Sequence, residues 1–495
     1  MAVRMRIESW PPRRWHADLG RRLAAVLDTE VTFFAGPAAH AATRRYIDRV
    51  LTFERVIDRA DQGFLAPVTA HPPVDKGGGI VVDLSAETRP NGRSWRVLFD
   101  GRAGHSAAAL ALAQGGVPLV TILDAEGTVR VQGRPGGEQP GSLSRALADV
   151  FTGTATLLTA ALTGRALGEP LPQAPDTPHA GPKNLGRLLA ERSVRKGVHA
   201  VYRMATRSPH WRVGWRRTPP GTDVAERSGE LAGEWTSLPD DGYHFYADPF
   251  LFERNGQCYL FVEDFDHRVQ RAHISVVEMD ENGPRGTPRP VLRRQVHLSY
   301  PFVLEHRDQV WMIPETSGAH RVELYRATRF PDEWVLDRVL IDGVDASDAT
   351  PVQHRGRWWL YATVRTAQTY SDHLHLWSAP DLLGPWTPHP GNPVLVDIAS
   401  ARPAGRFWVQ DGRLLRPTQD GRGGYGAAIN VMEVTHVDDH RFEQRLVAQI
   451  RPGGPWPGRR IHTVNRSAGF EVVDGSRVSA RLGLLRRAMQ RFTPQ

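Results

Sequence analysis

The chain has 495 residues, of which 40% are hydrophobic, and a formal net charge of +8. This length provides for two or three domains with buried cores. The single cysteine, Cys258, excludes a disulfide framework and fits a reducing compartment. No window approaches about 20 apolar residues, and the first 15 residues lack the apolar core of a signal peptide. We therefore expect a soluble, cytoplasmic protein.

The positive charge favours an anionic partner, such as a nucleotide-linked sugar, a nucleic acid or an anionic membrane face. An arginine-rich, GC-biased genome would account for part of the excess. The arginines are spread along the chain and form no basic stripe with exposed aromatic side chains, so we predict no nucleic-acid binding.

Residues 1–165 alternate strand and helix patterns, which predicts an α/β sandwich with a largely parallel sheet. No GxGxxG or Walker A motif occurs there, and Gly77-Gly78-Gly79 precedes a strand, so it is interpreted as a plain loop. The predicted strands are 5–10, 30–34, 78–86, 94–101 and 117–127, and the predicted helices are 15–26, 105–116 and 142–164.

Residues 166–225 begin with a proline-rich linker, which is followed by a basic amphipathic helix pattern. Such a helix packs on a neighbouring domain or lies on an anionic membrane. The basic tail, 476–495, allows the same two interpretations. The apolar side of the first helix carries Leu185, Leu188, Leu189, Val194, Val198, Val201 and Tyr202.

Residues 226–475 contain a repeat whose prolines fall at positions 249, 301, 351 and 403, in steps of 52, 50 and 52. Each proline is followed by a strand, a tight turn and a second strand, and a weaker fifth copy occupies 462–477. This period predicts a five-bladed β-propeller. The fold class is thus an N-terminal α/β sandwich followed by a propeller.

Blade alignment predicts which side chains meet at the central channel. The first strand of a blade lines the axis and the second runs back beside it, so the start of one and the end of the other share a mouth. The fifth copy adds His462, for which a structural and a ligand-binding role are equally open. The residues predicted at this mouth are Asp248, Glu263, Tyr300, Glu315, Asp348, Arg402, Gln419, His462 and Asn465, with Arg416 and Asp420 close by.

Four carboxylates and two arginines in one funnel need an explanation, because an unpaired buried carboxylate is costly. They form either an internal salt-bridge network that closes the channel or a site for a hydroxyl-rich ligand. Glycosyl transfer needs two carboxyl groups on opposite sides of an anomeric carbon, and Asp248 and Glu315 could provide them. Asp348 could shift the pKa of a neighbour or bind hydroxyls.

No group of His, Cys and Asp residues has the spacing of a zinc site, and we predict neither a metal nor a cofactor. A calcium ion held by the channel carboxylates is left open. The tryptophans near the repeats, Trp358 and Trp359 above all, are interpreted mainly as blade packing.

Several long segments carry a family resemblance: YADPFLF, LSYPFVLEHRDQVWMIPET, ELYRATRFPDEW, LLGPWTPHPGNPV, SARPAGR and RPTQD. Through them, residues 235–475 resemble the propeller domain of glucosamine inositolphosphorylceramide transferase and its bacterial relatives. More distantly, they resemble the five-bladed propellers of arabinanases, xylosidases and invertases. That resemblance implies that Asp248 is the base or nucleophile and that Asp348 matches a second aspartate. The acid glutamate of those enzymes comes from a later blade, where this chain has Gln419 and Asp420, which argues against ordinary glycoside hydrolysis.

Residues 1–165 resemble a formyltransferase-like domain without its HPSLLP-type segment, so formyl transfer is not predicted. The leading prediction is an enzyme that transfers a sugar, for example a furanose, from a nucleotide-linked donor to a small-molecule, glycan or lipid-linked acceptor. Asp248 would be the base, Glu315 and Asp348 would bind or stabilise the sugar, and Arg402 and Arg416 would bind donor phosphate. The alternatives are a glycoside hydrolase of furanosides or small oligosaccharides and a non-catalytic carbohydrate-binding propeller. The sequence gives no indication of the oligomeric state.

Overall fold

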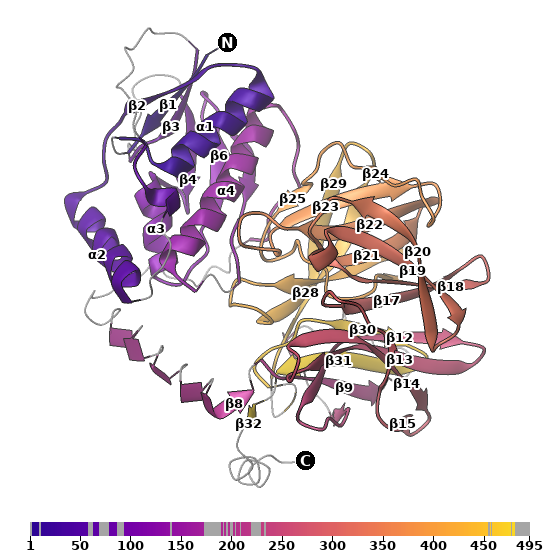
Figure 1. The fold of residues 1–495 in the computed structure, drawn as a ribbon. Coiled ribbons are helices and arrows are strands. Elements are labelled where there is room, and N and C mark those ends of the chain that lie inside the picture. Colours follow the sequence, from indigo (N-terminus) through magenta and orange to yellow (C-terminus); the bar gives the residue numbers. More distant parts are fainter. Residues whose placement is uncertain are drawn as a thin grey trace.

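The computed structural model contains an α/β domain beside a propeller (Figure 1). It describes residues 2–8, 11–57, 63–68, 79–86, 94–138, 141–172, 229–231, 234–453, 456, 458–476 and 478–480. Between 190 and 218 it describes 190–191, 193–194, 197–198, 201–202, 204–207 and 209–218. Most of the proline-rich linker, the leucines predicted on the basic helix and the tail at 481–495 lie outside the described residues. Within the described part of the chain, the helices are too short or too polar to cross a membrane.

The sheet of the α/β domain has the strand order β2-β1-β3-β4-β6-β7, with β5 beside β4. Strands β2, β1, β3 and β4 are parallel, whereas β6 and β7 run antiparallel to their neighbours. The α/β prediction is confirmed, although the sheet is parallel only on one side. A turn of a few residues joins β6 to β7, and such a short link permits only antiparallel pairing. The strands are β1 (Val3–Ile7), β2 (Val31–Ala35), β3 (Ile80–Leu84), β4 (Trp95–Phe99), β5 (Arg102–Ala103), β6 (Val120–Leu123) and β7 (Val129–Gly133).

The described part of this domain has the helices α1 (Arg14–Leu27), α2 (Ala41–Ile57), α3 (His105–Ala113) and α4 (Leu143–Leu162), of which α1, α3 and α4 contact the sheet and α2 packs on α3 and α4. Helix α4 contacts the other three helices and strands β6 and β7. Most of its 20 residues are buried, as expected for a helix that is apolar on nearly every side. Helix α2 was not predicted, although Tyr46, Ile47 and Val50 provide the apolar stripe that buries it.

The propeller has five sheets, one for each blade, which confirms the predicted architecture. The first two blades consist of β12 (His244–Arg254), β13 (Gln257–Asp266), β14 (Arg271–Asp280), β15 (Gly283–Pro284) and β16 (Arg289–Leu292), and of β17 (Ser299–His306), β18 (Gln309–Glu315), β19 (Arg321–Arg329) and β20 (Glu333–Asp342). Blade 3 consists of β21 (Ala346–His354), β22 (Arg357–Val364), β23 (His373–Ala379), β24 (Thr387–Pro388) and β25 (Leu395–Val396). Blade 4 consists of β26 (Trp408–Gln410), β27 (Arg413–Asp420), β28 (Ala428–Val437), β29 (Phe442–Arg451) and β10 (Gly229–Glu230).

Blade 5 combines strands from both ends of the repeat region. It contains β30 (Val464–Ser467) and β31 (Phe470–Ser476), together with β9 (Trp211–Arg217) and β11 (Thr236–Ser237). Strand β9 lies within 166–225, so the segment expected to be linker and helix contributes a strand to the propeller. Pairing an early strand with a late hairpin closes the ring and leaves no open edge strand between the first and last blades.

The inner strands of blades 1, 2 and 3 share a β-bulge at the channel. The register slips between Ala247 and Phe250 in β12, and at the equivalent points of β17 and β21. The first bulged residue has a positive φ each time: 45° at Asp248, 47° at Tyr300 and 55° at Asp348. The bulge therefore makes Asp348, and not Thr350, the counterpart of Asp248. Alignment on the prolines would place Thr350 there instead, because Pro351 lies three residues after Asp348, whereas Pro249 directly follows Asp248.

The two domains meet through the segment that follows β7. The backbone N–H of Arg134 donates to Val396 O, and its guanidinium lies 3.6 Å from the Asp397 carboxylate. Both side chains are fully buried, and Arg134 also donates to Leu171 O over 2.7 Å. The N–H of Gly136 donates to the Asp372 carboxylate over 2.9 Å. These contacts fix the α/β domain against blades 3 and 4.

Replacing Arg134 with methionine should weaken the interface, because it leaves the Asp397 carboxylate buried without its cation. Loss of one partner of a buried ion pair costs about 3–5 kcal/mol. Differential scanning calorimetry should show the α/β domain unfolding at a lower temperature and separately from the propeller. Arg130→Met is the control, because Arg130 is about half-exposed and lies 3.9 Å from its partner Asp124. Equal effects of the two substitutions would contradict this role of Arg134.

Candidate functional site

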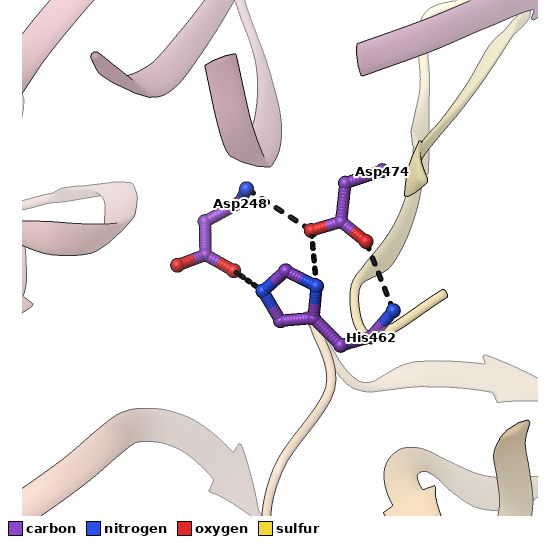
Figure 2. A group of neighbouring side chains, drawn as sticks. All are labelled: Asp248, His462 and Asp474. Atoms are coloured by element: carbon purple, nitrogen blue, oxygen red, sulfur yellow. Dashed lines mark hydrogen bonds and ion pairs between the residues drawn. The ribbon is translucent and has the colours of Figure 1, made fainter. Parts of the chain in front are cut away.

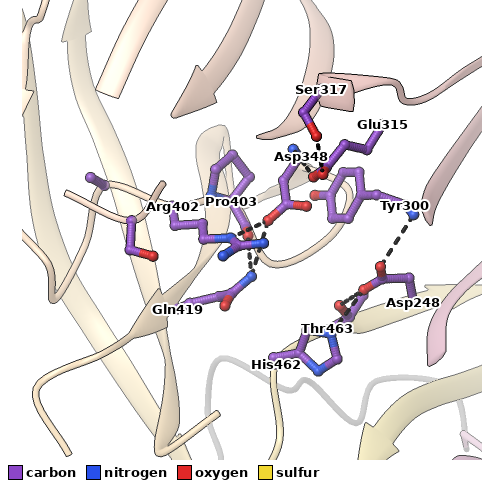
Figure 3. A network of polar contacts seen from close by, with 12 residues as sticks. Asp248, Tyr300, Glu315, Ser317, Asp348, Arg402, Pro403, Gln419, His462 and Thr463 are labelled. Carbon is purple, nitrogen blue, oxygen red and sulfur yellow. Dashed lines mark hydrogen bonds and ion pairs between the residues drawn. The ribbon is translucent and has the colours of Figure 1, made fainter. Parts of the chain in front are cut away.

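The channel mouth gathers the bulged residues of the inner strands and the ends of the strands beside them (Figure 3). Ala247, next to Asp248, pairs with Glu263, and Ser299, next to Tyr300, pairs with Glu315. In blade 4 the N–H of Gln419 donates to Arg402 O over 2.9 Å. A bulge in the left-handed region turns the side chain of its first residue out of the ordinary alternation. The repeat thus brings carboxyl and guanidinium groups from four blades to one place.

Asp248 is the most constrained of these carboxylates. Its Oδ1 accepts a 2.6 Å hydrogen bond from Thr463 Oγ1 and lies 3.2 Å from His462 Nε2. Its Oδ2 accepts a hydrogen bond from the N–H of Tyr300 over 3.2 Å. The other ring nitrogen of His462 lies 2.9 Å from Asp474 Oδ2, so the imidazole sits between two carboxylates (Figure 2).

These neighbours shift the pKa values of His462 and Asp248. Burial alone would lower the pKa of His462, but Asp474 and Asp248 raise it to about 10. Burial alone would raise the pKa of Asp248, but the His462 cation and the Thr463 hydroxyl bring it below its usual value. At neutral pH the chain Asp474–His462–Asp248 therefore consists of an imidazolium between two carboxylates, and Asp248 is ionised.

The same three side chains have ligand atoms within 4.8 Å of one another, which is the spacing of a metal site. A histidine binds a metal through a neutral ring nitrogen, whereas here both nitrogens of His462 face carboxylates that favour protonation. The positive charge that these carboxylates need is thus supplied by the imidazolium itself. The prediction that the site uses no metal is retained as a prediction.

Asp348 lies in the same network, but its pKa is shifted in the opposite direction to that of Asp248. Its Oδ2 accepts from Arg402 Nε over 2.6 Å and from Gln419 Nε2 over 3.1 Å. Its N–H donates to Glu315 Oε2 over 3.2 Å. Burial raises the pKa of Asp348 to about 8, and the Glu315 and Asp248 carboxylates add to this against the effect of Arg402. Asp348 therefore holds a proton near neutral pH, in contrast to Asp248.

Glu263 has a partner that the sequence analysis did not identify. His297 Nε2 lies 3.2 Å from Glu263 Oε1, and 44% of the His297 side chain is exposed. Burial alone would lower the pKa of His297, but Glu263 holds it above its usual value. His297 lies on the loop between blades 1 and 2, a position that blade alignment does not cover.

Four of the predicted site residues have structural roles instead. Tyr300 has no exposed surface; its hydroxyl accepts from the N–H of Gly405 and lies 2.9 Å from Thr350 Oγ1. Asn465 joins two blades by donating to Pro249 O and accepting from the N–H of Arg406. The polar groups of these two side chains are engaged by protein groups, and a contact of either with substrate stays a prediction.

Arg416 and Asp420 also lie in networks of their own. The Arg416 guanidinium is fully buried, where it donates to Ala401 O and to Gln444 and faces the Tyr361 ring. It therefore cannot reach a donor phosphate, contrary to the prediction. Asp420 accepts from Arg422, Asn430 and Gln449. Arg422 in turn donates to Pro172 O, which ties this network to the end of the α/β domain.

Asp474 was missed for an identifiable reason. In blades 1 to 4 the mouth residue lies seven positions after the turn, but the fifth hairpin is shorter and Asp474 follows Gly469 by five positions. Its N–H donates to Thr463 O, which is the same cross-strand relation that Gln419 has to Arg402.

Five sheets closed around a channel with paired carboxylates, an imidazolium and a guanidinium define the class: a five-bladed β-propeller with a polar site at its mouth. Residues 236–470 match the family model of the N-terminal domain of glucosamine inositolphosphorylceramide transferase 1. The resemblance stated from the sequence is thereby confirmed for the propeller.

The curated relatives named glucosamine inositolphosphorylceramide transferase 1 are longer proteins. The one from Oryza sativa subsp. japonica is 33% identical over 256 residues, which cover 48% of this chain and 34% of the relative. The one from Arabidopsis thaliana is 31% identical over 252 residues, which cover 48% of this chain and 33% of the relative. The chain thus spans about a third of their length.

Among solved structures, Zg3597, a family 117 glycoside hydrolase from Zobellia galactanivorans, is 12% identical with a TM-score of 0.35. The match covers 54% of this chain and 90% of that one. A thermostable family-43 glycoside hydrolase is 16% identical with a TM-score of 0.32, over 43% of this chain and 78% of that one.

Replacing His462 with glutamine should destabilise the protein in a pH-dependent way. Because the pKa of His462 rises from an ordinary 6.5 to about 10 on folding, its stabilisation is complete below pH 6.5 and is lost as the pH approaches 10. We expect the variant to melt about 5 °C or more below the wild type at pH 6, and the difference to shrink by pH 10. The exposed His440→Gln is the control, and a difference independent of pH would rule out the imidazolium.

Replacing Tyr300 with phenylalanine should lower stability without affecting ligand binding. The substitution leaves the N–H of Gly405 without its acceptor, which costs about 1–3 kcal/mol. Urea unfolding followed by tryptophan fluorescence measures this loss, with the partly exposed Tyr259→Phe as control. If Tyr300→Phe instead weakened sugar binding at unchanged stability, Tyr300 would be a substrate contact after all.

Proposed function

We propose that the propeller mouth is the active site of a glycosyltransferase that uses an activated, nucleotide-linked sugar. One observation carries this proposal: two carboxyl groups of the same mouth, Asp248 and Asp348, have pKa values shifted in opposite directions. Pairs of titratable groups whose environments separate their pKa values are typical of acid–base sites.

The transfer step follows from these charge states. Ionised Asp248 takes the proton of the acceptor hydroxyl as that oxygen attacks the anomeric carbon. The bond from the anomeric carbon to the donor phosphate breaks, and the phosphate leaves with the bonding electron pair. Arg402, which is held by Asp348, lies where it can stabilise the charge on the leaving group. Glu315 and protonated Asp348 hold the sugar hydroxyls.

The relatives suggest the chemical class of donor and acceptor. Their name describes transfer of glucosamine to inositolphosphorylceramide. Since the chain spans about a third of those proteins, both substrates are proposals here: an amino sugar as the transferred group, and an inositol phosphate or its lipid as the acceptor. A furanose donor, suggested by the distant arabinanase-like resemblance, is the alternative, and the cytoplasmic location remains a prediction.

A glycoside hydrolase is the second candidate, and the raised pKa of Asp348 favours it. Protonated Asp348 would act as the acid on the leaving oxygen, and Asp248 would activate a water molecule. Hydrolysis and transfer differ in the acceptor, which is water or a hydroxyl group, and in the leaving group. The same two carboxyl groups can act as acid and base in either reaction. A propeller that only binds carbohydrate would show neither reaction.

A thermal-shift screen with nucleotide sugars and free oligosaccharides tests the proposal. A ligand at about 100 times its dissociation constant adds about 2.7 kcal/mol of stability. We expect a shift with one nucleotide sugar, and release of its nucleotide when an inositol-containing acceptor is added. Asp248→Asn should lower turnover by about 10²–10⁴-fold while keeping the shift.

Asp308→Asn, at the turn between β17 and β18, is the matched control and should change neither quantity. Turnover of aryl glycosides without any nucleotide-sugar shift would favour the hydrolase. Binding of sugars without turnover of either substrate class would favour the binding propeller and overturn both enzymatic proposals.

A further inference from the structure

A second polar pocket lies between the two domains, beside the propeller mouth. It has a volume of about 190 Å³ and shares Arg402 with the site described above. The α/β domain lines one wall with the segment after β7 and the first turns of α4, and the link from β22 to β23 lines the other. The lining residues are Gly137, Glu138, Arg145, Asp149, Gln368, Thr369, Tyr370, Ser371 and Arg402.

The two arginines of this pocket have donors to spare. Arg145 is exposed, and within the described part of the chain its guanidinium has neither an ion pair nor a hydrogen bond; only its backbone N–H is engaged, with the Ser142 cap. Arg402 uses Nε for Asp348, while its Nη1 lies 3.8 Å from Glu138. About 14% of the Arg402 side chain is exposed. Each guanidinium offers five N–H donors and no acceptor.

Some of the acceptor capacity of the pocket is used by bonds within the protein. Glu138 accepts from the hydroxyl of Ser371, and Asp149 Oδ1 accepts from the N–H of Gln368 over 3.0 Å. The Thr369 hydroxyl accepts from the N–H of Ser371. The charged donors that remain belong to Arg145 and Arg402, and this pair of guanidiniums is the feature of the pocket that points to a ligand. It suits a ligand that consists mainly of acceptors, as phosphate oxygens do, better than a neutral sugar with balanced donors and acceptors.

Asp149 is the group that limits anion binding. It faces Glu138 of the loop, Asp372 just before β23, His373 at the start of β23, and the N–H of Gln368. Burial raises the pKa of Asp149 to about 7, and Asp372 and Glu138 add to the rise. The carboxyl group is therefore partly neutral near pH 7, and its negative charge grows as the pH rises.

We propose that this interdomain pocket binds the phosphate groups of the activated donor, and that Arg145 of the α/β domain completes a clamp with Arg402 of the propeller. The inference rests on the proposed function, since it places the leaving group next to the sugar site. It assigns to Arg145 the phosphate contact that the sequence analysis assigned to the buried Arg416. It also gives the α/β domain a role: it supplies one wall of the donor site.

Titration calorimetry with inorganic pyrophosphate tests the clamp without any sugar. We expect Arg145→Ala to weaken pyrophosphate binding about 10-fold or more, which corresponds to loss of one charge-assisted contact of about 1.5–3 kcal/mol, and Arg145→Lys to restore part of it. Arg22→Ala, on the exposed face of α1, removes the same charge outside the pocket and should change the affinity less than 2-fold. Equal effects of Arg145→Ala and Arg22→Ala, or tighter binding of methyl glucoside than of pyrophosphate, would overturn the clamp.

A second variant distinguishes binding in the pocket from a general effect of surface charge on anion affinity. Ionised Asp149 repels a phosphate, so the Asp149→Asn variant should gain affinity for pyrophosphate relative to the wild type as the pH rises from 6 to 8.5. A constant ratio of affinities across that range would exclude Asp149 from the site. Circular dichroism and melting curves check that each variant is folded.

The clamp and the proposed function can fail separately. If Arg145→Ala leaves pyrophosphate binding unchanged while the wild type transfers sugar, only the clamp is wrong. If Arg145→Ala weakens pyrophosphate binding but no nucleotide sugar is turned over, the anion site stands and the transferase proposal falls.

Discussion

The need to balance buried carboxylates with cations organises this structure. Asp248, Asp474, Glu263 and Asp348 are all buried around the channel, where an unpaired charge costs several kcal/mol. Three basic side chains face these carboxyl groups: His462 lies between Asp248 and Asp474, His297 lies beside Glu263, and Arg402 lies beside Asp348. They come from the fifth blade, from an interblade loop and from the fourth blade. These charges are paired only when the ring of blades is closed, so the site depends on the folding of the whole propeller.

The carboxyl groups of the mouth are not balanced equally, and their pKa values therefore differ. The imidazolium keeps Asp248 ionised, whereas burial and neighbouring carboxylates leave Asp348 with a raised pKa despite its contact with Arg402. A network that served only to close the channel would gain nothing from holding one carboxyl group near its titration point. Asp248 and Asp348 share their positive φ angles with Tyr300, because the same bulge occurs in all three inner strands.

The α/β domain is not simply appended to the propeller. Arg134 and Asp397 form a buried ion pair across the interface, and the N–H of Gly136 donates a hydrogen bond to Asp372 of blade 3. This docking carries Glu138 to within 3.8 Å of Arg402 and brings Arg145 to the same pocket. A rigid interface of this kind lets two domains share one ligand, because a displacement of about 1 Å is enough to spoil a binding geometry.

The sequence by itself determined the architecture and most of the inner ring. A repeat of about 50 residues built from short strands and tight turns predicts a ring of blades, and the alternation of strands and helices in 1–165 predicts an α/β domain, because both follow from local patterns. The period also placed Asp248, Glu315, Asp348 and Arg402 at one mouth. Tertiary structure alone decided which of the polar residues are used as structural bonds, as Tyr300, Asn465 and Arg416 are, since burial depends on neighbours that are distant in sequence. It also decided the contributions of His297, Asp474, Glu138 and Arg145, because a loop, a shortened hairpin and a second domain reach the site through docking, which no local pattern encodes.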